Sequence, residues 1–250
     1  MTFECQIEEG IACIRLRRGA FVLGTDLEEK QHVLDVFEEL ERSDEVRAVL
    51  LFNAADAYTR REHEHYVASL ARLRDSVHWE QATMLLERQD NALDQYALLA
   101  ARYDKLLVSC LVGEIATPFF GLSLTSDLRL AVPGMSFHLS HVDLGVPPIG
   151  GLGFLLPRYI GRGRAAEYLL SGGAIDAHAA RDLGLVNAIL ASDSFETDCV
   201  AWVRRILVSG TAHITATRRL IYRDVEAFGA YLQEESKLRR QMLHQPKNRF

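Results

Sequence analysis

The sequence predicts an α/β fold in which buried strands alternate with helices. Two nearly continuous apolar runs, Val46–Phe52 and Leu106–Val112, are short and rich in β-forming residues, as strands of a buried parallel sheet usually are. Helical periodicity dominates the last third of the chain. We therefore predict an α/β core over residues 1–190 and a helical region over residues 191–250.

The other elements follow from the pattern of apolar residues in chain order. Two alternating strands, Phe3–Ile7 and Ile11–Leu16, open the chain around a Glu9-Gly10 turn. A polar, histidine-rich segment, residues 53–65, follows the first buried strand. Helices are predicted over Leu27–Leu40, Tyr66–Leu73, Glu80–Leu99, Gly161–Leu170, Ala177–Leu183, Glu196–Leu207, Thr211–Tyr222 and Val225–Leu243, and a short strand over Ser136–Leu139.

Composition narrows the class of protein. The net charge is −6 with acidic and basic residues interspersed, which argues against a nucleic-acid partner because duplex binding depends on a concentrated basic surface. No apolar run is long enough to span a membrane, and the first ten residues do not form a signal peptide. The four cysteines are scattered without a CxxC pattern, so we expect reduced thiols in a cytoplasmic protein.

The segment Gly113–Gly161 carries the most specific pattern. A buried strand ends at Gly113, an irregular turn follows, and the sequence continues through Asp127–Ala131, Phe137, Val142–Gly145, Pro148, Gly150-Gly151, Leu156–Arg158 and, later, Gly184–Asn187. This order of positions resembles the crotonase (enoyl-CoA hydratase/isomerase) superfamily. The resemblance covers nearly the whole chain and includes the ending Gln245–Phe250.

The resemblance implies both a fold and a type of chemistry. The fold is a ββα superhelix of stacked turns with a C-terminal helical region that forms trimers, often paired into hexamers. The shared chemistry stabilises an enolate-like oxyanion, usually with two backbone N–H groups. We therefore expect a homotrimer or a dimer of trimers that acts on a small molecule, with no cofactor and no metal, and with CoA not favoured as a partner.

Both oxyanion-hole positions implied by the resemblance are altered. The first donor falls on the N–H of Glu62, where the segment Arg60-Arg61-Glu62 replaces small residues and obstructs the approach of a thioester. The second falls on Pro118, which has no N–H to donate. Two alternatives stay open here. The backbone could shift so that the N–H of Phe119 serves as the donor, or the alignment of this segment with the family's positions could be off by one residue.

The two glutamates of the family's hydratases fall on Gly121 and His141. Without these carboxylates, conventional hydration of an enoyl thioester is not expected. An imidazole has an ordinary pKa of about 6.5, so His141 is the predicted catalytic acid/base, with a structural role as the alternative. Asp143 either orients this imidazole or caps the following turn. His138 points to the other strand face and is interpreted as structural.

A second group of polar residues borders the expected site. The spacing in His63-Glu64-His65 suits no common metal pair, and a solvated helix N-terminus is the preferred interpretation, although either histidine could assist His141. Glu234 and Glu235 are interpreted as surface charge, with a contribution to a neighbouring subunit's site as the alternative. The predicted substrate-binding residues are Arg61, His65, Thr117, Pro118, Phe119 and Phe120.

The favoured hypothesis is hydrolytic cleavage of a carbon–carbon bond in a β-dicarbonyl compound that is not attached to CoA. A branch of the superfamily typified by 6-oxocamphor hydrolase is similar, with an imidazole at the His141 position and a proline-containing turn before Asp127. That branch also has an aspartate near Gly150 and a second histidine near Pro118, which this chain lacks. The alternatives are a CoA- or carrier-bound acyl decarboxylase or isomerase, another biosynthetic tailoring enzyme, or a non-catalytic subunit.

Overall fold

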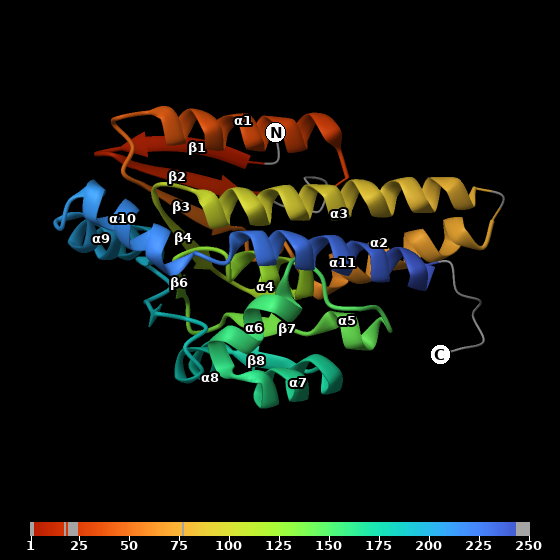
Figure 1. Ribbon diagram of the computed structural model, residues 1–250. Helices are drawn as coiled ribbons and strands as arrows, with labels where there is room; N and C mark the ends of the chain where they lie inside the picture. Colours follow the sequence, from red (N-terminus) through yellow and green to blue (C-terminus); the bar gives the residue numbers. More distant parts are fainter. Residues whose placement is uncertain (1–2, 18, 20–24, 77, 244–250) are drawn as a thin grey trace.

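A computed structural model describes residues 3–17, 19, 25–76 and 78–243 of the chain (Figure 1). Its strands form a six-stranded sheet in the order β1-β2-β3-β4-β6-β9 and a three-stranded sheet in the order β5-β7-β8. The larger sheet consists of β1 (Phe3–Glu8), β2 (Ile11–Leu16), β3 (Ala48–Asn53), β4 (Leu106–Leu111), β6 (Leu128–Ala131) and β9 (Ala188–Ile189). The smaller sheet consists of β5 (Glu114–Ala116), β7 (Ser136–His138) and β8 (Ala174–Asp176).

The predicted α/β class is confirmed by the connections between the strands. β1 and β2 are antiparallel and are joined at Glu9 and Gly10, whose φ angles of 49° and 80° fit a tight hairpin turn. All the other pairs in the larger sheet are parallel, so each needs a crossover. Both apolar runs predicted as buried strands are strands, and every residue of β4 is buried.

The helices are α1 (Leu27–Arg42), α2 (Arg60–Arg74), α3 (Trp79–Arg102), α4 (Thr117–Ser123), α5 (Ser140–Asp143), α6 (Leu152–Ile160), α7 (Arg162–Ser171), α8 (Ala177–Asp182), α9 (Phe195–Leu207), α10 (Thr211–Ile221) and α11 (Val225–Leu243). In Figure 1, α1 lies against the larger sheet, while α11 runs beside α3. The smaller sheet lies with α6, α7 and α8 on the other side of α11 in this view.

Several helices begin where the sequence pattern did not predict a helix, and α2 and α4 among them border the expected site. α2 begins at Arg60 rather than Tyr66, because the side chain of Thr59 accepts a hydrogen bond from the N–H of Glu62 and caps the helix. α4 begins with Thr117 and Pro118. Proline suits the first turn of a helix, where an N–H has no partner within the helix, so Pro118 has a local structural role.

One continuous apolar core joins the larger sheet, the smaller sheet and α9. Phe195 of α9 packs edge-on against Phe52 of β3, with ring centroids 6.2 Å apart. Phe120 of α4 stacks on Phe137 of β7 at 4.0 Å. The boundary at residue 190 stays a prediction, since residues on both sides of it contribute to this core.

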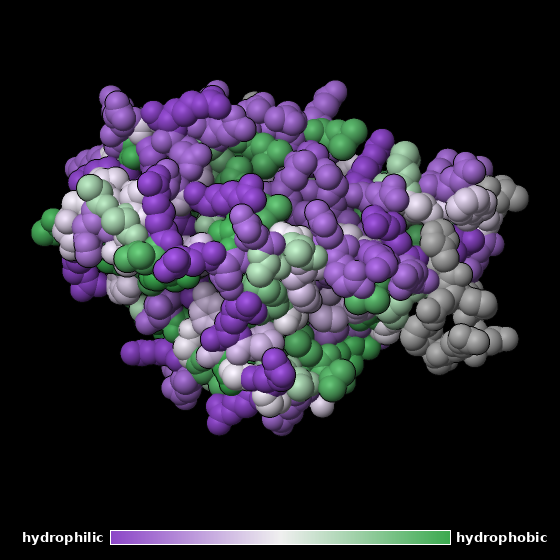
Figure 2. Space-filling view, viewed as in Figure 1, coloured by the Kyte–Doolittle hydropathy of each residue, from purple (hydrophilic) through white to green (hydrophobic). Residues whose placement is uncertain are grey.

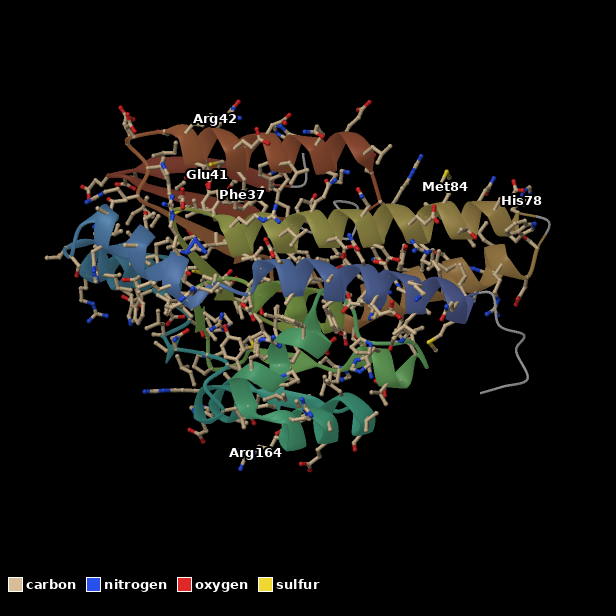
Figure 3. All side chains as sticks on the ribbon, viewed as in Figure 1. Phe37, Glu41, Arg42, His78, Met84 and Arg164 are labelled. Atoms are coloured by element: carbon tan, nitrogen blue, oxygen red, sulfur yellow. The ribbon has the colours of Figure 1, made fainter. Side chains whose placement is uncertain are left out.

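The outer helices present polar side chains to solvent. Hydrophilic residues cover most of the face seen in Figure 2. In Figure 3, Arg42 on α1 and His78 at the start of α3 project away from the body of the molecule. Among the described residues, no helix is long and apolar enough to cross a membrane.

A buried ion pair fastens α10 to the core. The guanidinium of Arg218 lies 2.8 Å from Asp127, and their side chains are 5% and 12% exposed. The same guanidinium donates hydrogen bonds to three backbone carbonyl groups near the end of α3 and the start of β4, those of Ala100, Tyr103 and Lys105.

Replacement of Arg218 by Met is therefore expected to lower the free energy of unfolding by about 3–5 kcal/mol, because Asp127 would stay buried without its counter-charge. Urea unfolding followed by circular dichroism measures this change. The neighbouring Arg219 pairs with Asp104 at the surface and serves as the matched control. Arg219→Met should change the unfolding midpoint very little, and an equal loss in both variants would contradict the assignment.

Candidate active site

Four buried polar side chains form one hydrogen-bonded chain at the junction of α2, α4 and α5. Nδ1 of His63 lies 2.8 Å from Oγ of Ser140, which lies 3.3 Å from Oγ1 of Thr117. Oγ1 of Thr117 lies 3.0 Å from Nδ1 of His141. None of the four residues is more than 2% exposed. The structure thus links two imidazoles through two hydroxyl groups.

The direction of the hydrogen bonds follows from the groups at the His141 end. Nε2 of His141 lies 3.0 Å from the carbonyl oxygen of Leu169, which only accepts, so Nε2 carries the proton. Nδ1 then accepts from the hydroxyl of Thr117, and the hydroxyl of Ser140 donates to Thr117. Ser140 in turn accepts from Nδ1–H of His63. This assignment leaves the lone pair of His63 on Nε2.

Burial keeps both imidazoles in the neutral, basic form at neutral pH. Burial is the largest cause that lowers the pKa of His63 to about 3, and the charges of Arg239 and His141 act in the same direction. Burial also lowers the pKa of His141, but the hydrogen bond to Leu169 and the charge of Asp143 oppose this shift. A proton shared between the two rings is therefore better accommodated on His141.

The other residues predicted around His141 have different positions. Asp143 is 47% exposed and lies 3.8 Å from Arg60, so Thr117 and Leu169, rather than Asp143, hold the imidazole. The interpretation of His63 as part of a solvated helix N-terminus is wrong, because His63 is 0% exposed.

The loop that should carry the first oxyanion donor is tied to other groups. The N–H of Glu62 donates to Oγ1 of Thr59 at 3.3 Å, and the N–H of Arg60 donates to the carboxylate of Glu114 at 2.7 Å. Tyr58, with a φ of 66°, stacks its ring on Phe119 at 3.5 Å. These contacts fix the loop against β5 and α4 and occupy two of its N–H groups.

Backbone atoms fill the space where the hydratase glutamate would lie. A Cβ atom on Gly121 would lie 2.3 Å from the carbonyl oxygen of Gly150. Gly150 has a φ of 74°, and a Cβ atom there would lie 2.4 Å from the carbonyl oxygen of Pro118. The segment around Gly150 is therefore packed directly on α4, with room for neither the glutamate nor the aspartate of the similar branch.

The residues predicted to bind substrate divide into two groups. Arg61 and His65 lie on the exposed side of α2, away from His63. Among the turn residues, Thr117 contacts His141, whereas Phe120 packs into the core. Pro118 is buried and Phe119 is half-buried, and their contact with a substrate stays a prediction.

The two acidic residues of α11 differ from each other. Glu234 is exposed and pairs with Lys237 at 3.2 Å, as expected for surface charge. Glu235 is buried and accepts a hydrogen bond from the N–H of Gly151 at 3.3 Å, so its interpretation as surface charge is wrong. Burial raises the pKa of Glu235 to about 8. A helical period over Phe228, Leu232, Glu235 and Arg239 could have revealed this buried face from the sequence.

A cavity of about 310 Å³ opens beside this network, between α2, the segment 144–147 and α11. Val67, Leu70 and Ala71 line it, and they share one face of α2 with His63 through the helical repeat.

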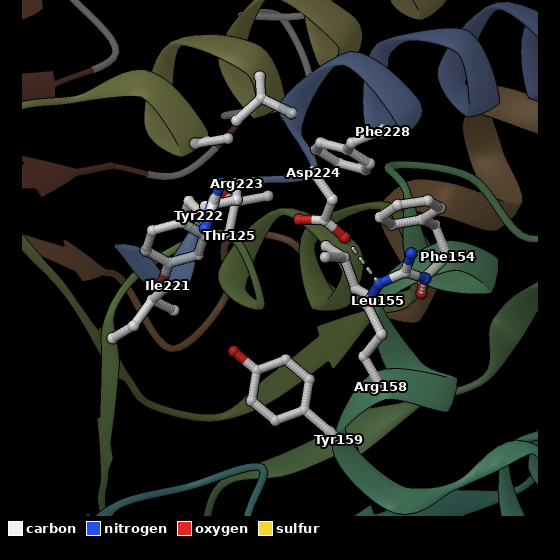
Figure 4. A pocket seen from close by; sticks show the side chains of 12 residues that line it. Thr125, Phe154, Leu155, Arg158, Tyr159, Ile221, Tyr222, Arg223, Asp224 and Phe228 are labelled. Carbon is white, nitrogen blue, oxygen red and sulfur yellow. Dashed lines mark hydrogen bonds and ion pairs between the residues drawn. The ribbon is translucent and has the colours of Figure 1, made fainter. Parts of the chain in front are cut away.

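A second cavity of about 320 Å³ has an aromatic lining that includes Phe154 and Tyr159, with an ion pair between Arg158 and Asp224 (Figure 4). No member of the histidine network is among the residues that line either cavity. In the described part of the chain, no three His, Cys, Asp or Glu residues are arranged to hold a metal ion.

The close packing at Gly121 can be tested with a single methyl group. Gly121→Ala is expected to lower the free energy of unfolding by roughly 1–3 kcal/mol, because the added Cβ meets backbone rather than a movable side chain. Gly163 lies in α7 with nothing near its would-be Cβ, so Gly163→Ala should cause no loss. Urea unfolding of both variants checks this, and a Gly121→Ala protein as stable as the native one would contradict the packing described.

The neutral state of His63 predicts a dependence of stability on pH. The folded pKa of about 3 lies below the unfolded value of about 6.5, so the unfolded state takes up the proton first as the pH falls. The stability difference between the native protein and His63→Asn should therefore shrink below about pH 6.5, by up to about 1.4 kcal/mol per pH unit, until about pH 3. Urea unfolding at a series of pH values measures it, and a difference independent of pH would show that His63 is not held neutral.

Comparison with known proteins identifies the family. The family model described as Enoyl-CoA hydratase/isomerase matches residues 6–249. A protein named probable enoyl-CoA hydratase echA17 from Mycobacterium avium (strain 104) is 29% identical over 189 residues, which cover 76% of this chain and 69% of that protein. The putative enoyl-CoA hydratase/isomerase YngF from Bacillus subtilis (strain 168) is 32% identical over 110 residues, 42% of each chain.

Solved structures confirm the predicted crotonase-like fold. An enoyl-CoA hydratase from Bacillus halodurans superposes with a TM-score of 0.81 at 19% identity, covering 98% of this chain and 96% of that one. A putative enoyl-CoA hydratase/isomerase from Acinetobacter baumannii gives a TM-score of 0.76 at 20% identity, covering 98% and 95%. Since the family model spans nearly the whole chain, the protein belongs to the enoyl-CoA hydratase/isomerase family, within the crotonase superfamily.

Proposed function

We propose that the protein hydrolyses a carbon–carbon bond in a β-dicarbonyl compound, with two imidazoles in place of the hydratase glutamates. The observation that carries the proposal is the hydrogen-bonded chain from His63 to His141, because it joins two neutral bases through hydroxyl groups that can pass a proton. Gly121 lies at the position of the first hydratase glutamate, and backbone packs directly against it. This packing supports a reaction that does not use a carboxylate at that position.

The proposed reaction adds water across one carbon–carbon bond. The water oxygen adds to one ketone carbon while an imidazole takes a water proton. Collapse of the adduct breaks the bond between that carbon and the central carbon, whose electron pair leaves as an enolate. The enolate carbon then takes the proton from the imidazolium, so the products are a carboxylic acid and a ketone.

The two histidines have different proposed roles in this reaction. His63 shares a face of α2 with Val67, Leu70 and Ala71, which line the cavity, so we assign it the proton transfer with water. The proton is passed through Ser140 and Thr117 to His141, where the Leu169 carbonyl and the charge of Asp143 favour the cation. His141 thus holds the proton as the acid/base partner, while Ser140 and Thr117 are positioning residues.

The contacts of the loop that should carry the first oxyanion donor support a substrate that is not a thioester. The N–H of Arg60 is bonded to the carboxylate of Glu114, which would repel a developing oxyanion, and Pro118 has no N–H. The relatives are named as enoyl-CoA hydratases or isomerases, which favours a CoA thioester as substrate. The second candidate is therefore an enzyme that acts on an acyl-CoA, as a decarboxylase or isomerase, with the same histidines. Stabilisation by an acyl-CoA, measured as a rise in melting temperature, would support this candidate over the hydrolase.

We also propose that the chain assembles as a homotrimer or a dimer of trimers. Val208, Leu220 and Ile221 are 86%, 70% and 66% exposed on α10 and the segment before it. Three large apolar side chains gathered and exposed at one helix are typical of a surface that another protein chain covers, which supports contact with a second subunit there.

The role of the histidine chain is tested with a panel of linear and cyclic β-diketones, whose cleavage removes the enol absorbance. His63→Ala and His141→Ala are each expected to lower turnover by roughly 100- to 10,000-fold, the range of general acid–base catalysis. Thr117→Val keeps the shape but breaks the relay, so it should cause a smaller loss and change the pH profile of the rate.

The control for these variants is His178→Ala, on the exposed side of α8, which should leave turnover unchanged. Full activity in His63→Ala and His141→Ala would refute the mechanism. A native protein that cleaves no β-diketone and binds no acyl-CoA would favour a non-catalytic subunit.

A further inference from the structure

A buried arginine of α11 is among the residues that line the cavity of about 310 Å³. Arg239 lines this cavity and its side chain is 5% exposed. Arg74 also lines the cavity, but its side chain is 26% exposed and pairs with Asp75. The remaining wall is apolar and consists of Val67, Leu70, Ala71, Leu86, Leu144, Gly145, Val146, Pro147, Met242 and Leu243. Because apolar surroundings screen a charge poorly, a charged group in such a wall interacts strongly with an ion that the cavity binds.

Two side chains of α3 hold the guanidinium in place. Nη1 of Arg239 forms an ion pair with Asp90, whose side chain is 6% exposed, and Nη2 lies 2.5 Å from Oε1 of Gln89. Arg239 also forms a side-chain hydrogen bond with Tyr66. A guanidinium has five N–H donors, so these three contacts still leave donors for a further oxygen atom. The ion pair with Asp90 weakens the field of the cation but fixes its orientation, which is the condition for pre-organised stabilisation.

The positions that usually supply oxyanion donors in this fold are occupied or absent, as described for Arg60, Glu62 and Pro118. Cleavage of a β-dicarbonyl compound nevertheless places negative charge on oxygen, first in the adduct and then in the enolate. A cation near the reacting atoms must therefore replace those donors. Arg239 is close enough to His63 for its charge to lower the pKa of that imidazole.

We propose that Arg239 meets the oxyanion that forms in the cavity between α2 and α11, and that this cavity therefore also binds the enolate form of compact, apolar β-dicarbonyl compounds as a mimic of that anion. The inference rests on the proposed function, since it names the group that would stabilise the charge of that reaction. The volume of about 310 Å³ suits a small molecule with a branched or cyclic apolar body. His63 and Arg239 then act on the same substrate as base and anion-binding group.

Dimedone provides a direct test, because this cyclic β-diketone is an enolate at neutral pH and carries an apolar body. Calorimetry should show that the native protein binds dimedone at least about tenfold more tightly than 3,3-dimethylcyclohexanone, a neutral ketone of similar shape. Arg239→Met should remove this preference, whereas Arg239→Lys should keep part of it. Val67→Trp should weaken the binding of both compounds, because it fills the cavity without changing its charge.

Arg239→Met leaves Asp90 without its counter-charge, so the double variant Asp90→Leu/Arg239→Met provides a folded, uncharged version of the site. Its circular dichroism and melting temperature confirm the fold before binding is measured. Equal affinity for dimedone in the native protein and the double variant would overturn the inference, as would a native protein that binds no dimedone. Failure of the proposed function is distinguishable, because it is measured as turnover in the histidine variants, whereas dimedone binding requires no reaction.

Discussion

The close contact between α4 and the Gly150 segment determines what the rest of the site can be. Gly121 lies against the carbonyl of Gly150, and Gly150 lies against the carbonyl of Pro118, at separations that exclude any side chain. Backbone thereby occupies the volume that a catalytic carboxylate would need. Pro118, which starts α4 without an N–H, removes a donor from the same place. The constraint is steric, and in the proposed mechanism the acid–base chemistry lies on the histidines of α2 and α5 instead of on α4.

The buried polar chain follows from that packing. A hydroxyl or imidazole sealed from water loses free energy unless it finds a partner, and Thr117 provides partners on both sides. Its N–H donates to Ser140 at 3.3 Å, and its hydroxyl bonds to Nδ1 of His141. Thr117 therefore connects α4 and α5, while Ser140 extends the connection to His63 of α2. The same contacts that satisfy buried polar groups also create a path for a proton.

The sequence predicted the strands and the family, because both depend on apolar runs and residue spacings that are local in the chain. The runs that became β3 and β4 are apolar throughout, and the spacing after Gly113 was sufficient to predict the family. The start of α2 was placed too late, because its capping depends on Thr59 rather than on an apolar period. The burial of His63 was missed because it depends on contact with α5, which is distant in the sequence. Likewise, nothing local to Arg239 shows that Asp90 and Gln89 of α3 receive it.

In the proposed mechanism, the electrostatic asymmetry of the site gives the two histidines separate tasks. Arg239 disfavours a second positive charge on His63, while the Leu169 carbonyl and Asp143 favour one on His141. A proton taken up at His63 therefore moves away from the cation and toward groups that stabilise it. The same cation that drives the proton away attracts an anion formed in the cavity. In the proposed reaction, removal of the proton and formation of the enolate thus depend on one charge, which gives a role to a buried, paired arginine near a neutral histidine in a fold that usually relies on backbone donors.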